Sequence, residues 1–121
     1  MNTLTTQGIK VSVEPFYLPK ESFPSQHRYV HAYRITIDNR SEHTVQLLRR
    51  HWYIMESNGL VREVEGEGVV GLQPILQPNE KHTYTSWCPM MTDMSKMYGT
   101  FKMQNLAVSY THLTLPTTPY V

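Results

Sequence analysis

The sequence has 121 residues, with 11 Lys and Arg against 10 Asp and Glu, a single cysteine and a formal net charge of +1. That length suits one domain and not two, and the near-neutral charge argues against a dedicated nucleic-acid binder. The lone Cys88 excludes an internal disulfide, and no apolar run reaches the roughly 20 residues that span a bilayer. Residues 1–10 lack the basic-then-apolar pattern of a signal peptide, so we expect a soluble, cytoplasmic protein.

Apolar and polar residues alternate near the start of the chain, as they do in a half-buried strand. Ile9, Val11 and Val13 indicate a first strand, which Pro15 is expected to end. Further prolines predict an irregular loop or an edge segment over residues 17–26, because proline cannot donate to a strand ladder.

The clearest strand covers residues 29–38. One face of it carries Tyr29, His31, Tyr33, Ile35 and Ile37. The next strand, residues 44–56, starts with Leu47 inward but has Trp52 as its later core candidate. This change of parity predicts a β-bulge around residues 48–50.

Turns and shorter strands complete the pattern. Residues 39–42 predict a polar turn, and Ser57-Asn58-Gly59 predicts a tight hairpin after which residues 60–65 pair back. Residues 81–87 and 96–104 also alternate. Several short strands without a helical segment predict an all-β fold, an immunoglobulin or fibronectin type III-like β-sandwich.

Large apolar residues identify the expected core. Trp52 and Tyr33 are placed there, because an immunoglobulin-like core requires a Trp that faces the opposite sheet. Five clustered methionines are expected to pack in the core and loops rather than to form an adaptable contact surface. They are Met90, Met91, Met94, Met97 and Met103.

The segment Gly66-Glu67-Gly68-Val69-Val70-Gly71 matches the glycine pattern of dinucleotide-binding loops. In such loops the pyrophosphate sits on the N-terminus of a following helix. Here Pro74 and Pro78 prevent a helix of useful length, and nearby glutamates would repel a phosphate. We interpret the glycines as serving a strand end or a close backbone turn. A second interpretation is a surface that faces a ligand or partner, with Val69, Val70 and Leu72 exposed.

The same segment carries a family resemblance. Residues 62–71, followed by Gln73-Pro74, closely resemble the central motif of the bacterial ApaG family. Other segments resemble that family in the same order, namely residues 33–37, 45–52, 78–80 and 99–100. The resemblance covers residues 7–106 and implies a fibronectin type III or immunoglobulin-like sandwich. Two positions depart from the family pattern: His31 on an apolar strand face, and Trp87-Cys88-Pro89-Met90-Met91 in place of a small-residue loop.

The resemblance also bears on function. It implies an association with cobalt tolerance and magnesium efflux, without catalytic residues to carry over, and related domains look like protein-interaction modules. We therefore expect a non-catalytic module with a protein partner, without a cofactor, nucleic acid or membrane; self-association stays open. The alternative is binding of a phosphate or nucleotide through Gly66, Glu67, Gly68, Val69, Val70 and Gly71.

The family pattern stops near Leu106. From about residue 108 the chain is uncharged and rich in Thr, Pro and Leu, and it resembles a translated sequencing adapter. We expect residues 1–107 to be an ApaG-like sandwich that lacks its native C-terminal strands, and residues 108–121 to be a non-native tail. An unpaired strand edge would then make this chain prone to aggregation.

Metal binding is not expected. The six histidines are His27, His31, His43, His51, His82 and His112. His27 and His31 share a predicted strand face, but four residues of strand span about 13 Å, too far for one ion. None of the histidines has a chelating spacing, so structural or solvated roles are favoured.

Catalysis is not expected either. Cys88 has no base at a defined spacing. Glu63, Glu65 and Glu67 are predicted to form a solvated face opposite Arg49, Arg50 or Arg62, not a general acid/base pair.

Overall fold

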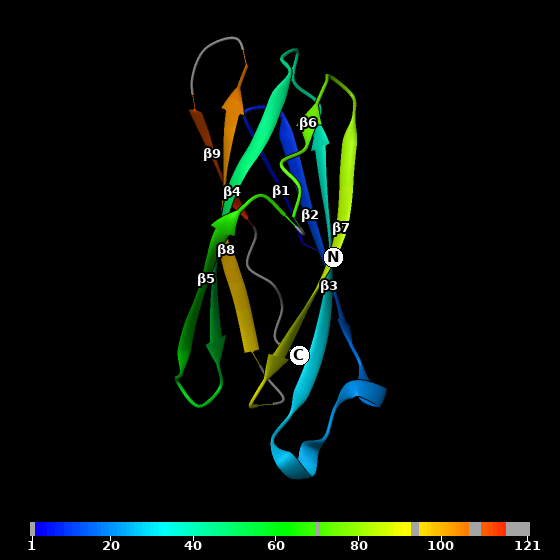
Figure 1. The fold of residues 1–121 in the computed structure, drawn as a ribbon, viewed down its shortest axis with the longest axis vertical. Helices are drawn as coiled ribbons and strands as arrows, with labels where there is room; N and C mark the ends of the chain where they lie inside the picture. Colours follow the sequence, from blue (N-terminus) through cyan, green and yellow to red (C-terminus); the bar gives the residue numbers. More distant parts are fainter. Residues whose placement is uncertain (1, 70, 93–94, 107–109, 116–121) are drawn as a thin grey trace.

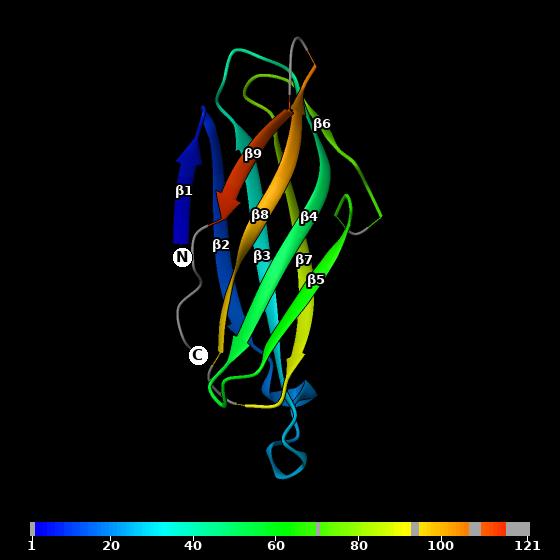
Figure 2. The ribbon, with the colours of Figure 1, turned by 90° about the vertical axis from the view of Figure 1, so that its left-hand side faces the viewer.

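The computed structural model describes residues 2–69, 71–92, 95–106 and 110–115. Two antiparallel sheets lie face to face (Figure 1). The first has the order β1 (Asn2–Thr6), β2 (Ile9–Tyr17), β3 (Tyr29–Asn39) and β7 (Lys81–Met90). The second has the order β5 (Val61–Glu67), β4 (Val45–Glu56), β8 (Ser95–Asn105) and β9 (Tyr110–Leu115), and β6 (Ile75–Leu76) pairs with β4. Figure 2 shows the second sheet from its outer side. The predicted immunoglobulin or fibronectin type III-like sandwich is confirmed.

The core lies between the sheets, as expected from the apolar faces of the strands. Tyr33 on β3 and Trp52 on β4 are both buried there, which confirms their predicted place. Trp52 meets the ring of Phe101 on β8 edge to face, with 6.1 Å between the ring centroids. Of the clustered methionines, three are buried, one is exposed and Met94 lies outside the described residues.

The predicted bulge in β4 is confirmed by its pairing with β8. Leu47 faces Met103 and Arg49 faces Lys102, so Leu48 is an extra residue in the register. Because of this extra residue, Leu47 and Trp52 both point into the core although they have opposite parity. Arg50 has the same parity as Trp52, so it also lies on the inner side of the sheet.

Both predicted turns are present. Gly59 has φ of 89° in the hairpin between β4 and β5, as an Asn-Gly turn requires. The turn after β3 is organised by Asn39, whose buried amide donates to the carbonyl oxygens of His43 at 2.7 Å and Leu76 at 2.9 Å. Its side-chain oxygen accepts the Ser41 N–H at 3.0 Å.

Two local predictions about the first sheet are wrong. Pro15 does not end β2, which continues to Tyr17. Beyond Val13, β2 has no β1 partner, so a residue without an N–H is tolerated there. His27 does not share a strand face with His31, because it caps the short 3-10 turn η2 (Pro24–Gln26) with φ of 54° and β3 begins only at Tyr29.

Three strands were not predicted. The pair in β6 is too short for periodicity to reveal, and the Thr-rich β1 has little apolar alternation. The third, β9, lies in the suspected tail and pairs with β8 through its main chain. Main-chain pairing needs no particular side chains, so the boundary at residue 107 stays a prediction. The predicted irregular segment contains the 3-10 turns η1 (Pro19–Glu21) and η2. None of the helices in the described part of the chain has the length and apolar character needed to cross a membrane.

Candidate functional site

The glycine-rich segment closes on itself after β5. Gly68 has φ of 62°, and a Cβ at this position would lie 2.1 Å from the carbonyl oxygen of Leu72. The Gly68 N–H donates to the Leu48 carbonyl at 2.7 Å. Val69 and Leu72 exchange two N–H···O bonds of 2.7 and 2.9 Å. The prediction of a close backbone turn is therefore confirmed.

The exposure predicted for this loop is partly wrong. Val69 is 0% exposed and belongs to the core, because the turn folds it back between the sheets. Leu72 is 56% exposed, as predicted, and Val70 lies outside the described residues. A phosphate site needs free amides, but those of Gly68, Val69 and Leu72 already donate to carbonyl oxygens. Phosphate or nucleotide binding here stays an untested prediction.

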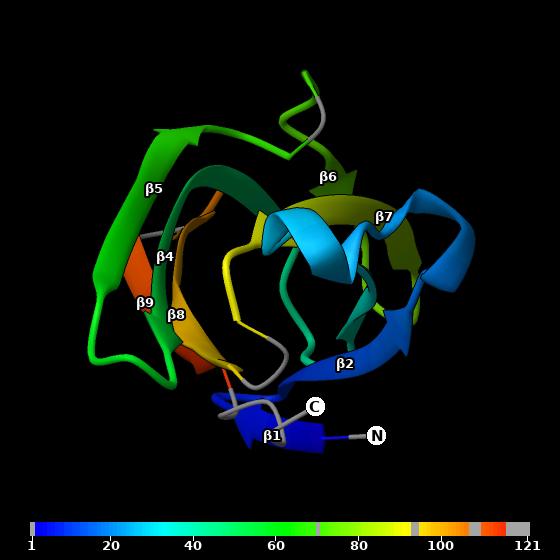
Figure 3. The ribbon, with the colours of Figure 1, turned by 90° about the horizontal axis from the view of Figure 1, so that it is seen from below.

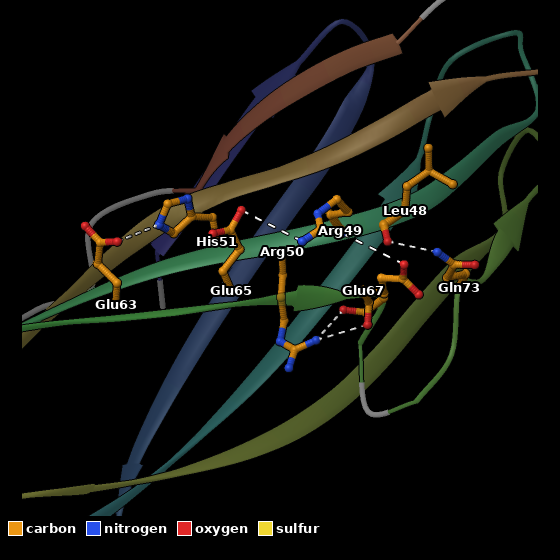
Figure 4. A network of polar contacts seen from close by, with 9 residues as sticks. Leu48, Arg49, Arg50, His51, Glu63, Glu65, Glu67 and Gln73 are labelled. Atoms are coloured by element: carbon orange, nitrogen blue, oxygen red, sulfur yellow. Dashed lines mark hydrogen bonds and ion pairs between the residues drawn. The ribbon is translucent and has the colours of Figure 1, made fainter.

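The three glutamates of β5 form an exposed face, as predicted. Arg49 contacts Glu65 and Glu67 at 3.9 Å each, and His51 Nε2 lies 3.5 Å from Glu63 Oε2 (Figure 4). All three carboxylates are largely solvated, and such pairs contribute only about 0–1 kcal/mol each. Of the arginines proposed as partners, only Arg49 has this role.

Arg50 lies on the other side of β4 from Arg49 (Figure 4). Its Nη1 donates to the carbonyl oxygens of Gly68 at 2.8 Å and Glu67 at 3.2 Å. These bonds hold the glycine loop against β4 and fix the guanidinium. Arg62 bridges the two sheets instead, because its Nη2 donates to the Pro89 carbonyl at 2.7 Å.

One side of the sandwich contains a pocket. Because β1 lies beside β9, the other two edge strands, β5 and β7, share the opposite side (Figure 3). A pocket of about 190 Å³ lies there, lined from both sheets by residues that include Arg50, Trp52, Tyr84, Trp87 and Cys88. This pocket, rather than the glycine loop, is the concave candidate site.

Two ionisable groups in the pocket are held neutral. Tyr84 is 8% exposed, and burial raises its pKa while the charge of Arg50 opposes that rise. Its hydroxyl lacks a hydrogen-bond partner of normal geometry, although the Trp52 indole lies beside it. Burial also raises the pKa of the Cys88 thiol, against the opposing charge of Arg62. Cys88 is therefore a poor nucleophile near neutral pH.

The described histidines lie apart from one another. His31 is buried on β3, while His51 stacks on Tyr53 with 4.5 Å between the ring centroids. His82 lies on β7 in the other sheet, and His112 falls among residues whose side chains are not described. Within the described part of the chain, no three His, Cys, Asp or Glu side chains are placed to hold a metal ion.

Sequence reasoning did not bring Arg50 and Tyr84 together. The predicted bulge could have shown that Arg50 points inward, since it places Arg50 on the same strand face as Trp52. The contact also requires the order of strands in the two sheets, which brings β4 and β7 together across the core. Local periodicity holds no information on that order.

Comparisons with known proteins agree with this fold. The ApaG domain family model matches residues 19–105. A Brucella anthropi protein named Protein ApaG is 48% identical over 116 residues, which cover 96% of this chain and 89% of the relative. A Brucella abortus Protein ApaG is 49% identical over 104 residues, covering 86% and 80%. These names denote no enzymatic activity.

A solved structure is also similar. The crystal structure of the ApaA protein from Bordetella pertussis superposes with a TM-score of 0.89 at 40% identity, covering 91% of this chain and 89% of that one. The family match, the identity over most of the chain and the shared sandwich lead to one conclusion: the chain belongs to the ApaG family.

Proposed function

We propose that the chain is a non-catalytic module that binds a protein partner in the cytoplasm. Through that partner it takes part in cobalt tolerance and magnesium efflux, the processes that the ApaG resemblance implies. Its indirect part in metal handling is consistent with the scattered positions of the described histidines. The high pKa of the Cys88 thiol and the solvated glutamate face give no support to an enzymatic alternative.

The observation that carries this proposal is Trp87. It is 60% exposed on β7, an edge strand that pairs only with β3 within the described sheets. Exposing so large an aromatic surface has a cost in free energy, and Trp is enriched among the residues that dominate protein interfaces. Val61 and Val64 on β5 are exposed on the same side of the sandwich.

The form of β7 points to the kind of partner. An edge strand offers a row of unpaired N–H and C=O groups to an extended segment of another protein. A hollow of about 270 Å³ beside Trp87, lined by residues 18–21, would receive one side chain of that segment. The partner is therefore a protein that presents an extended, partly apolar segment.

Site-specific crosslinking tests the proposal. A photo-reactive phenylalanine analogue is placed at Trp87 in living cells, and a matched control is placed at Leu4 on β1, on the opposite side. We expect a discrete protein adduct at position 87 and none at position 4. The purified partner should then bind Trp87→Ala at least tenfold more weakly than the wild type and bind Leu4→Ala normally. Identical adducts at both positions, or none at 87, would contradict the proposal.

The link to metal handling needs a cellular measurement. In cells that lack the gene, wild-type protein should restore growth in cobalt, and Trp87→Ala at an equal protein level should not. Full restoration by Trp87→Ala would show that the β7 surface is not needed for this process.

A further inference from the structure

We propose that the pocket between β5 and β7 binds a free small molecule composed of one aromatic ring and one carboxylate. This ligand is distinct from the protein partner proposed above and does not depend on it. The pocket lies between the sheets, whereas the partner surface follows the outer edge of β7.

The size of the pocket sets the size of the ligand. Its volume of about 190 Å³ exceeds that of an engineered apolar cavity of about 150 Å³ that binds benzene. One ring with one small substituent therefore has room, whereas a nucleotide is too large to be enclosed.

The walls favour an aromatic ring. The rings of Trp52 and Tyr84 line the pocket together with the aliphatic side chains of Ile54 and Val64. Such rings provide stacking and edge-to-face contacts for one further aromatic ring. The pocket is open to solvent on the side between β5 and β7, so a ligand has a route inward.

Arg50 specifies the charge of the ligand. Its Nη1 donates to two main-chain carbonyl oxygens, and among the described residues no carboxylate lies within ion-pair distance of its guanidinium. Those bonds use Nη1 and orient the guanidinium, whose fork geometry suits a carboxylate. Glu67, the one acidic residue within the glycine-rich segment, contacts Arg49 on the outer face instead.

Tyr84 supplies the second polar contact. Its hydroxyl is buried in the pocket wall beside the Trp52 indole, which can only donate, so the Tyr84 O–H has no acceptor among the described residues; Arg50 lines the same pocket. A buried donor without an acceptor destabilises the empty protein. A carboxylate can accept from the Tyr84 hydroxyl with one oxygen and from the Arg50 guanidinium with the other. One carboxylate then pairs with the Arg50 charge and also accepts the hydrogen bond of the Tyr84 O–H.

The probe for this site is 4-fluorobenzoate, observed by ¹⁹F NMR during titration with the full chain. We expect saturable binding with a dissociation constant on the order of 1 mM, which is usual for a ligand with so few atoms. The uncharged 4-fluorobenzamide should bind at least tenfold more weakly. Equal binding of the two probes, or no binding of the acid at 10 mM, would overturn the proposal.

Matched variants assign the contacts. Arg50→Gln should weaken 4-fluorobenzoate binding at least tenfold, and Arg49→Gln, which removes the same charge from the outer face, should leave it unchanged. Because Arg50→Gln also loses bonds to the glycine loop, Tyr84→Phe provides a second test. Tyr84→Phe should keep or raise the thermal midpoint of the empty protein but weaken the acid about threefold or more. If Tyr84→Phe or a folded Arg50→Gln binds the acid as well as the wild type does, the proposed contacts are wrong.

Discussion

His31 is a fully buried histidine in a mainly apolar setting. It lies on β3 between Tyr17 of β2 and Cys88 of β7, and its ring centroid is 5.2 Å from that of Tyr17. Neither ring nitrogen has a hydrogen-bond partner, and burial lowers the pKa of the imidazole from its usual 6.5. The folded protein therefore holds His31 in its neutral form at neutral pH.

This burial predicts a pH dependence of stability. The unfolded chain takes up a proton at His31 near pH 6.5, whereas the folded chain does so only at lower pH. The His31 contribution is therefore fully present above pH 6.5 and is lost as the pH falls from there toward the folded pKa. Urea unfolding at pH 7.5 and pH 5 measures the resulting loss in the free energy of unfolding. The loss should be smaller in His31→Phe, and the exposed control His43→Gln should keep the full loss. An equal loss in His31→Phe would contradict this account.

At the scale of elements, β4 and the glycine loop form one unit. The bulge at Leu48 turns Arg50 inward and leaves the Leu48 carbonyl free to accept the Gly68 N–H at 2.7 Å and the Gln73 amide at 3.0 Å. Arg50 in turn holds the carbonyl of Gly68. The glycine loop therefore fits against the bulge, and Gly68 is the glycine that the close packing of main chain on main chain requires.

Substitutions of Gly68 and Gly71 by alanine test this interpretation. Gly68 and Gly71 both have positive φ, but an added Cβ meets the Leu72 carbonyl oxygen at 2.1 Å at Gly68 and open space at Gly71. Gly71→Ala should cost only the left-handed backbone penalty of about 1–2 kcal/mol. Gly68→Ala should cost about 3 kcal/mol or more, because the loop must also shift. Urea unfolding of both variants measures the difference. Equal costs would show that the close approach at Gly68 does not constrain the loop.

The elements also show what a sequence can predict. Alternation identified β3, and the parity change identified the bulge, because both depend on neighbouring residues. The extension of β2 through Pro15 was missed because it depends on where β1 stops, which is a property of the sheet. The burial of Val69 is not predictable from its neighbours for a similar reason: it depends on a turn that closes through Leu72.

At the scale of the whole molecule, the pocket depends on strand order. Arg50 and Tyr84 are far apart in sequence and belong to different sheets, and they meet because β4 and β7 lie across the core from each other. Family resemblance could predict the sandwich but not this pair. The similarity to the Bordetella pertussis structure supports the strand arrangement.

The C-terminal side of the sandwich depends on a strand from the suspected tail. β8 carries the buried residues Phe101 and Met103, and its outer edge pairs with β9 in the uncharged segment after residue 108. Natural edge strands often carry charged side chains, which limit association with other chains. This segment has no charged residue, and Pro116 and Pro119 cannot donate to a ladder.

We expect the 121-residue chain to be less stable and more prone to aggregation than a chimaera that carries the Brucella anthropi relative's sequence after Leu106. The chimaera should be monodisperse and melt at least about 5 °C higher, which corresponds to roughly 1 kcal/mol for a domain of this size. A chain that ends at Leu106 leaves one edge of β8 without a partner strand, although β4 still pairs with the other edge, and should melt lowest of the three. Scanning calorimetry with light scattering gives both quantities, and equal midpoints for the chimaera and the 121-residue chain would show that the present tail completes the fold as well as a natural one.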